Sequence, residues 1–326
     1  MNKISIRLIQ KSEKLPEMVC NNFFHSIDFF LIAEKTPGYA PLMAVAENSQ
    51  GTILAHLLAL ICRHGKLFPP YLYTHGRVYG EGEYVQETDR EQLFGMMLKA
   101  VTQKFNHKLC LYIEFSDISN KMFAYRHFRK NGYFPIPWQE IHNSLHSLSP
   151  EKRISEKAMA KIESAEKHGV YTREIKNEDE LTEFYNLLRN YFRFKTRRSI
   201  PQKKMFCLLN SSGNSKTFVT IYKNKIIGGC VCLYSGKNAY MWYLASKRKT
   251  YIHLSPSSIT VWAAIKYAYA HEYEHIYFLD AGLPFRNNPF RDFILSFGGK
   301  PVSKYRWFKF PLPYINKVLS WCYNDK

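Results

Sequence analysis

No apolar run in the 326-residue sequence approaches the roughly 18 residues that a membrane-spanning helix needs. The longest candidate, residues 53–62, is shorter and contains His56. The N-terminus alternates as a strand does, and no apolar segment followed by small residues marks a signal peptide. An apolar fraction of 46%, with 16% aromatic residues, excludes a disordered chain. We therefore expect a folded, cytoplasmic protein.

Cysteine is sparse and irregularly spaced. The seven cysteines lie at positions 20, 62, 110, 207, 230, 232 and 322, an odd number without metal-ligand spacing. This usage fits a reducing compartment better than a disulfide framework. The histidines show no ligand spacing apart from His271 and His275, whose separation straddles an expected helix end. The sequence therefore predicts no metal site.

Acidic residues are absent from a long stretch of the second half. Residues 1–148 hold 16 Lys and Arg against 13 Asp and Glu, a net +3, whereas residues 149–326 hold 30 against 14, a net +16. Residues 184–271 contain 15 basic residues and no acidic one. Such a stretch attracts polyanions, namely phosphorylated cofactors, RNA or anionic lipid head groups. The alternative is the solvated face of a basic protein.

Hydrophobic periodicity predicts two copies of one α/β unit. In the second half it predicts helices at 155–167, 177–192, 255–271 and 290–296, and strands at 170–175, 217–222, 226–234, 239–245, 276–280 and 302–310. Turn-forming residues separate the three middle strands, which predicts an antiparallel meander. The first half repeats this order more loosely, with helices at 16–35, 89–105 and 120–130 and strands at 4–9, 42–47, 52–63, 71–77 and 109–115. We expect mixed sheets in two tandem domains, residues 1–148 and 149–326.

Three short motifs carry a resemblance to a known family. They are the basic helix 153–169 leading to Phe184-Tyr185, the strand end Phe278-Leu279-Asp280-Ala281-Gly282, and Phe290-Arg291 followed by Phe297-Gly298-Gly299. With the element order, they resemble the Fem family of aminoacyltransferases (FemA, FemB and FemX types) and their acyltransferase-like relatives. The resemblance implies two tandem domains of the GNAT acyltransferase fold.

The sequence departs from this family in three places. Arg291 stands where the family has a lysine, and a planar guanidinium is not equivalent to an ammonium. The long helical arm of some Fem enzymes has no counterpart. The glycine-rich pyrophosphate loop of ordinary GNAT enzymes is also missing, because residues 246–258 contain no glycine. The identity of the acyl donor therefore stays open.

Candidate donor-binding residues lie around one expected helix start. Lys247, Arg248 and Lys249 precede Ser257 and Ser258, and cationic side chains beside free backbone N–H groups form a phosphate site. The alternative is a helix cap flanked by solvated lysines.

Candidate catalytic residues follow from the resemblance and from position. The resemblance implies that Arg291, with Phe290 packed beside it, stabilises the tetrahedral intermediate or positions the donor. An ordinary arginine in a first helical turn is the alternative. Asp280 lies at a strand end next to a glycine, and its candidate role is to orient the amine or to accept its proton. The structural alternative is that Asp280 bonds the following turn or pairs with Arg286. We also consider Arg286 a candidate substrate-binding residue.

Two further residues complete the candidate site. Strand alternation places Tyr240 and Trp242 on one face and Tyr243 on the other, with core packing as the ordinary role of all three. No carboxylate lies on this strand, so the candidates for accepting the amine proton are Asp280, a tyrosine such as Tyr243, and the substrate itself. Lys35 resembles a lysine with which Fem-type enzymes hold the phosphates of the acceptor.

The resemblance thus implies an N-acyltransferase of Fem type, and we expect a transferase with no tightly bound cofactor. One interpretation has aminoacyl-tRNA as donor and a peptidoglycan precursor, in cell wall biogenesis, as acceptor. The second has acyl-CoA as donor and a small or lipid amine as acceptor. A rival from another class is a non-catalytic RNA-binding or scaffold protein. DNA is not an expected partner, and the amphipathic residues 311–323 either pack on the protein or contact a membrane surface.

Overall fold

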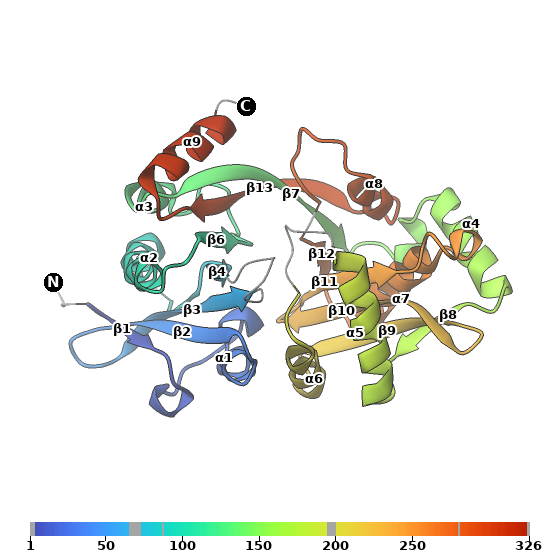
Figure 1. The fold of residues 1–326 in the computed structure, drawn as a ribbon, viewed down its shortest axis with the longest axis horizontal. Coiled ribbons are helices and arrows are strands. Elements are labelled where there is room, and N and C mark those ends of the chain that lie inside the picture. The colour runs from blue at the N-terminus through green and yellow to red at the C-terminus, as the bar shows by residue number, and fades with distance from the viewer. Residues whose placement is uncertain (1–3, 65–72, 87, 194–199, 280, 325–326) are drawn as a thin grey trace. The chain divides into compact units, whose positions relative to one another are not determined.

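In the computed structural model, the residues described are 4–64, 73–86, 88–193, 200–279 and 281–324 (Figure 1). They form two compact units, Met1–Trp138 with Ser303–Lys326, and Gln139–Val302. We refer to these as unit 1 and unit 2. The division differs from the expected one after residue 148, because residues 139–148 group with unit 2 and residues 303–326 group with unit 1. Unit 1 takes the end of the last strand, where Trp307 pairs with Phe115, and unit 2 takes Ile141, which pairs with Phe278.

Unit 1 is a mixed sheet in the order β1-β2-β3-β4-β6-β13. Its strands are β1 Ser5–Ile9, β2 Tyr39–Glu47, β3 Ile53–His64, β4 Tyr73–Tyr79, β5 Glu83–Tyr84, β6 Tyr112–Ser116 and β13 Lys300–Lys309, with β5 pairing β3. Its helices are α1 Ile27–Glu34, α2 Arg90–His107, α3 Tyr125–Lys130 and α9 Pro313–Asn324. The pair β4–β6 is parallel, and the other neighbours in this order are antiparallel.

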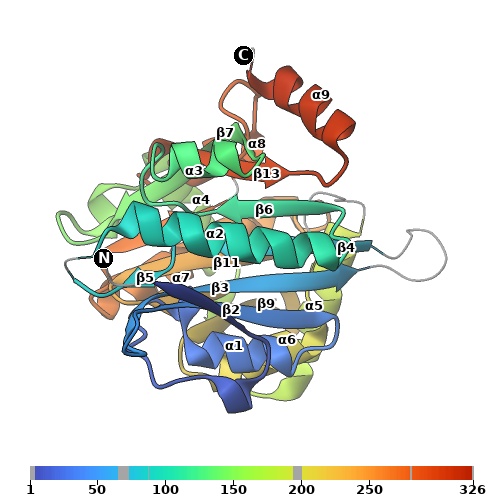
Figure 2. The ribbon, with the colours of Figure 1, turned by 90° about the vertical axis from the view of Figure 1, so that its left-hand side faces the viewer.

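A buried core lies between α2 and the sheet of unit 1. Helix α2 runs along β2 and β3 (Figure 2), and Leu93, Met97 and Val101 line its buried face at helical spacing. The helix expected at 16–35 is shorter in the structure. The side chain of Ser26 accepts a hydrogen bond from the N–H of Phe29 and caps α1, which therefore begins only at Ile27.

Unit 2 is a mixed sheet in the order β7-β12-β11-β10-β9-β8. Its strands are β7 Phe134–Ser144, β8 Tyr171–Glu174, β9 Ser215–Tyr222, β10 Lys225–Ser235, β11 Asn238–Ser246 and β12 His275–Phe278. Its helices are α4 Glu156–Lys167, α5 Glu178–Phe192, α6 Lys203–Ser211, α7 Pro256–Ala270 and α8 Pro289–Leu295. The antiparallel meander β9-β10-β11 confirms the expected one, and β11 and β12 are parallel.

Two adjacent glycines on β10 let helices approach both faces of this sheet. A side chain at Gly228 would meet the Thr260 hydroxyl of α7, and one at Gly229 would meet the Phe184 ring of α5 at 2.7 Å. Consecutive strand residues point to opposite faces, so α7 and α5 cover opposite sides of β10. This layering places the start of α7 beside the end of β11.

The Phe297-Gly298-Gly299 motif has a structural cause. Gly298 has a φ of +90°, and a side chain there would lie 2.5 Å from the carbonyl oxygen of Arg153. At Gly299 a side chain would lie 2.4 Å from Ile141. Both positions therefore admit only glycine without a local shift. None of the described helices has the length and apolar character needed to cross a membrane.

Candidate functional site

The paired part of β11 and β12 ends in the middle of β11. The two strands pair only from Asn238 with His275 to Met241 with Phe278, while β11 continues to Ser246. A β-bulge lies at this point, because Val231 pairs with Tyr243 and Cys232 with Met241. The bulge bends β11 where its pairing with β12 ends. Among the described residues, no strand pairs with Leu244–Ser246 on the side away from β10.

The bulge also overturns the expected alternation of aromatic rings on β11. Trp242 is the extra residue of the bulge, and its ring lies 4.9 Å from that of Tyr243. Both rings also lie near Phe206 of α6, at 6.3 and 5.6 Å. The two side chains are therefore not on opposite faces. Tyr243 is buried, with the ring of Phe192 at its edge.

A basic segment follows β11 directly. Lys247, Arg248 and Lys249 are all exposed, and none of them has an acidic partner in the described part of the chain. The carbonyl of Lys247 accepts hydrogen bonds from the N–H groups of Thr250 and Tyr251, which folds the segment into a turn.

Two more lysines lie at the same end of the meander. The N–H of Lys247 donates to Ile227, and Gly228 pairs with Ser246. This register brings exposed Lys223 and Lys225 to the end of the sheet where β11 finishes. We call Lys223, Lys225 and Lys247–Lys249 together the basic edge. Five cations at one edge produce a local positive potential that attracts phosphate.

Lysines at the opposite end of these strands form ion pairs with glutamates, unlike those of the basic edge. Lys216 contacts Glu174 at 2.8 Å, and Lys237 contacts Glu274 at 2.5 Å. The hydrogen bond that Lys237 donates to Glu274 raises the pKa of Lys237, and the one that Lys216 donates to Glu174 raises the pKa of Lys216. Within the meander and the segment that follows it, the cations without an acidic partner among the described residues are therefore those of the basic edge.

Helix α7 begins beside the basic edge in a strained conformation. Its N-cap, Ser255, has φ 41° and ψ 49°, the left-handed region that costs a non-glycine residue about 1–2 kcal/mol. The side chain of Ser255 makes no cap hydrogen bond, and Pro256 follows it. The hydroxyl of Ser257 bonds that of Ser246 at 2.6 Å, which ties the helix start to the end of β11. Ser258 is buried.

Arg291 supports the loop between β12 and α8. Its guanidinium donates to the side-chain oxygen of Gln139 at 2.7 Å, to the carbonyl of Leu283 at 3.2 Å and to the carbonyl of Arg286 at 3.0 Å. Arg291 is half-buried. These three bonds tie Arg291 to Gln139 and to residues 283–286.

Other contacts fix the same loop. Asn288 donates to the carbonyl of Ala281 at 2.7 Å and accepts from the N–H of Phe290, which caps α8. The N–H of Gln139 donates to the carbonyl of Gly282 at 2.8 Å. Side chains therefore bind three carbonyl groups of the loop that follows β12, and the main chain of β7 binds a fourth.

The remaining predicted residues are placed as follows. Asp280 lies outside the described residues, as do residues 194–199, which include three of the basic residues of the stretch 184–271. Arg286 is exposed, and Phe290 packs against the core of unit 2 with its ring 6.4 Å from that of Phe293. Lys35 belongs to unit 1, where it is the exposed C-cap of α1. The structure therefore brings together Lys247–Lys249 and Ser257, and separately Arg291 and Arg286.

A hollow of about 390 Å³ in unit 2 lies between α7 and β8. Its lining carries both signs of charge, with Arg173 and Lys266 opposed by Glu166 and Glu174. No residue of the predicted site lines it, so we do not assign the donor to this hollow.

Two clusters of thiol, imidazole and carboxylate groups in unit 1 have metal-ligand chemistry. The first is Cys62, His64 and His75, and the second is Cys20, His56 and Glu83. Sequence spacing did not indicate either one. The only signal was the Cys-x-His alternation at 62 and 64, which puts both side chains on one face of a strand.

In the second cluster the polar atoms have protein partners. Nε2 of His56 lies 3.9 Å from Cys20 Sγ and 3.7 Å from Glu83, whose carboxylate accepts the N–H groups of Asn21 and Asn22 at 2.8 and 2.9 Å. Burial disfavours the charged imidazole, but the contacts with Cys20 and Glu83 outweigh it and raise the pKa of His56 to about 9. This cluster is an internally satisfied ion pair.

Comparison with known proteins identifies the fold. Residues 152–287 match the family model of the acetyltransferase (GNAT) domain. The structure is similar to that of FemX, with a TM-score of 0.62 and 11% identity over 92% of this chain and 94% of that one. The chain has the tandem GNAT fold.

Two further structures support this assignment. A tandem GNAT protein from the clavulanic acid biosynthesis pathway aligns with a TM-score of 0.60 and 11% identity, over 94% of this chain and 99% of that one. L-PGS from Bacillus licheniformis aligns with a TM-score of 0.59 and 13% identity, over 90% and 92%. No curated protein matches in sequence. The resemblance to Fem-type proteins is confirmed at the level of the fold.

Proposed function

We propose that this tandem GNAT protein is an N-acyltransferase whose phosphorylated donor binds at the end of β11. The observation that carries the proposal is the continuity of residues 244–258. A strand edge, a run of exposed cations and the start of a buried helix follow one another there. The GNAT fold of this unit supports an acyl-transfer reaction at that place.

Each part of this segment suits one part of a donor. Leu244–Ser246 presents backbone N–H and C=O groups to an extended chain, in the manner of an added strand. Lys247–Lys249 and the N-terminal N–H groups of α7 suit phosphate oxygens. Ser255, whose backbone is strained, lies between the basic segment and α7. Strained backbone conformations are concentrated at ligand-binding sites.

The reaction is a transfer of an acyl group to an amine. The nitrogen lone pair attacks the carbonyl carbon, a C–N bond forms, and the C–O bond of an aminoacyl ester or the C–S bond of a thioester breaks. The proton of the amine passes to the leaving hydroxyl or thiol. Asp280 remains our candidate for orienting the amine, and Tyr243 for relaying the amine proton to the leaving hydroxyl or thiol.

Aminoacyl-tRNA is the first candidate donor. The basic edge carries five exposed cations at separate positions on two segments, which suits a polyanion with many phosphates better than one pyrophosphate. We propose the amine of a peptidoglycan precursor as the acceptor, since the fold is similar to that of FemX. The non-catalytic alternative is a protein that binds tRNA at the same residues but transfers no acyl group.

Acyl-CoA is the second candidate donor. The N-terminus of α7 beside a bent strand favours it, because a helix start offers several N–H groups to one pyrophosphate. The acceptor is then a small or lipid amine. The exposed apolar side chains of α9, Tyr314 and Trp321, at 79% and 69% exposure, give a second reason to consider an acceptor at a membrane surface.

Mass spectrometry of reaction products tests the proposal. The protein is incubated with peptidoglycan precursors or simple amines and with either charged tRNA or mixed acyl-CoAs. We expect a mass increment on the amine with one donor pool. The double variant Lys247→Ala/Lys249→Ala is expected to lower transfer at least about tenfold through donor affinity, because removing a cation that neutralises a phosphate weakens binding.

A matched control removes the same charge elsewhere. Lys216→Ala/Lys237→Ala deletes two lysines from the opposite end of the same strands and is expected to leave the KM for the donor unchanged. Equal effects of the two double variants would mean that net charge, and not the basic edge, governs binding. Salt-sensitive tRNA binding with no product from any donor would favour the binding protein.

A further inference from the structure

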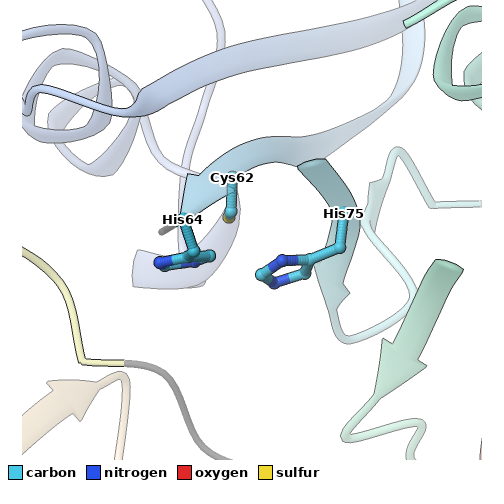
Figure 3. Close-up of side chains that lie close together, drawn as sticks. All are labelled: Cys62, His64 and His75. Atoms are coloured by element: carbon cyan, nitrogen blue, oxygen red, sulfur yellow. The ribbon is translucent and has the colours of Figure 1, made fainter. Parts of the chain in front are cut away.

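Three side chains with metal-ligand atoms meet where β3 and β4 pair in unit 1 (Figure 3). Cys62 and His64 are two residues apart on β3, so they share one face of the strand. His75 is the cross-strand partner of Cys62 on β4. The thiol sulfur and one ring nitrogen from each histidine all lie within 4.8 Å of one another. Strand register alone therefore creates the cluster.

Each of the two imidazoles has a ring nitrogen that no group among the described residues satisfies. Nε2 of His64 and Nδ1 of His75 are buried and have no hydrogen-bond partner among the described residues. His75 is 1% exposed, as is Cys62. A buried polar atom without a partner is costly, and each such atom in a folded protein requires a cause.

Stacked rings surround the two imidazoles. The ring of Tyr112 stacks on His75 at 4.8 Å, and the rings of His64 and His75 lie 4.9 Å apart with an 18° interplanar angle. Tyr73 lies 5.8 Å from His64 and 5.9 Å from His75. Such packing fixes the ring planes, yet stacking satisfies no nitrogen lone pair. An aromatic cluster alone therefore leaves the two nitrogens unexplained.

The charges of Arg77 and Glu114 both act on the Cys62 thiol. The Arg77 guanidinium opposes a second cation, but it is 3.8 Å from the carboxylate of Glu114. A thiolate at Cys62 would supply a further negative charge beside the ion.

We propose that Cys62, His64 and His75 bind a Zn²⁺ ion, with a fourth position taken by water. One thiolate and two imidazoles form a donor set that zinc prefers, and three protein ligands leave one tetrahedral position open. On binding, the Cys62 thiol releases its proton to solvent and the S–Zn bond forms, with no change of oxidation state. Among the described residues, no fourth protein ligand belongs to the group.

Binding requires a small adjustment of side chains. Zinc–sulfur and zinc–nitrogen bonds of about 2.3 and 2.0 Å place tetrahedral ligand atoms about 3.3–3.6 Å apart, against separations of up to 4.8 Å here. A turn of the Cys62 side chain, with shifts of the two imidazoles within their stacked planes, would close this difference. The bound ion would join β3 to β4, and the site is independent of the proposed acyl transfer.

Metal titration of the full chain tests the site. The protein is stripped with a chelator and titrated with Zn²⁺ by calorimetry and with Co²⁺ by absorption spectroscopy. We expect one ion per chain, a thiolate-to-cobalt charge-transfer band and a higher melting temperature with Zn²⁺. Cys62→Ser is expected to abolish the band. His75→Gln is expected to weaken Zn²⁺ binding by more than about a hundredfold, which exceeds the usual effect of changing a residue that only supports a ligand.

Two cysteine variants serve as controls. Cys110→Ser alters another buried cysteine of unit 1 that is outside the cluster, and Cys20→Ser alters the second cluster. Both are expected to keep the cobalt band. Absence of Zn²⁺ binding by the wild type would overturn the proposal, as would a band that survives Cys62→Ser and disappears with Cys20→Ser. Because the decisive titration uses the wild type, failure of a variant to fold does not remove the test.

Discussion

Substitution of Arg291 by lysine separates two roles for this residue. If a positive charge near the reacting carbonyl is what matters, Arg291→Lys retains it. If the guanidinium acts by holding the loop after β12, lysine cannot replace it, because three donated bonds diverge to Gln139, Leu283 and Arg286. The geometry supports the second role.

The magnitude follows from the three hydrogen bonds. A charged donor contributes about 1.5–3 kcal/mol per bond when buried and less when half-exposed, so we assign about 1 kcal/mol to each. A lysine ammonium reaches one or at most two of the three acceptors. We therefore expect Arg291→Lys to lower the free energy of unfolding by about 1–2 kcal/mol and Arg291→Ala by about 2–3 kcal/mol.

Urea unfolding and transfer kinetics together form the assay. We expect Arg291→Lys to lose turnover along with stability, and Gln139→Ala to reproduce part of both losses. The two substitutions should be non-additive in a double-mutant cycle because they share a bond. Arg248→Lys on the exposed basic edge is the matched control and should leave stability unchanged. An Arg291→Lys variant with unchanged stability and turnover would refute the positioning role.

Three other outcomes are expected. Gly298→Ala should destabilise the protein by about 2–4 kcal/mol in urea unfolding, because a positive φ and a 2.5 Å approach to Arg153 are combined; a loss below about 0.5 kcal/mol would contradict that geometry. The pKa of His56 is raised to about 9, so its contribution to stability is full below about pH 6.5 and is lost as the pH rises through 9. Unfolding measured from pH 6 to 10 should show this decline in the wild type and not in His56→Gln. Finally, if α9 contacts membranes, Trp321→Ala should reduce sedimentation with anionic vesicles, and equal sedimentation of both proteins would assign that contact elsewhere.

Local patterns predicted much of unit 2. The meander β9–β11 was predictable because alternating strands are separated by Lys223-Asn224-Lys225 and by Ser235–Asn238, which are turn sequences. The start of α7 was predictable from Pro256 at its first turn. Helix α6 was missed because its short amphipathic segment, Lys203–Ser211, has no side-chain cap signal.

Long-range pairing was not predictable from one sequence. The end of β13 belongs to unit 1 because of residue pairs such as Trp307 with Phe115. No local sequence pattern encodes such a pair. The bulge at Trp242 overrode the period-two expectation for β11. The cluster of Cys62 and His75 depends on strand register in the same way, because their separation in sequence carries no ligand signal.

The candidate site likewise contains some residues that the sequence identified and others that only the structure identified. The basic segment Lys247–Lys249 and the helix start at Ser257 were identifiable because they are neighbours in sequence. The addition of Lys223 and Lys225 to the same edge required the β10–β11 register. The role of Arg291 required its acceptors, which lie on the loop before it and on β7.

The most direct test of the account is the mass of an amine acceptor after incubation with the protein and each donor pool. The account predicts an increment of one acyl or aminoacyl group, with a raised KM for the donor in Lys247→Ala/Lys249→Ala and an unchanged KM in Lys216→Ala/Lys237→Ala. Transfer that is equally fast in both double variants would contradict a donor site at the end of β11. No increment with any donor and amine would contradict the assignment as an acyltransferase.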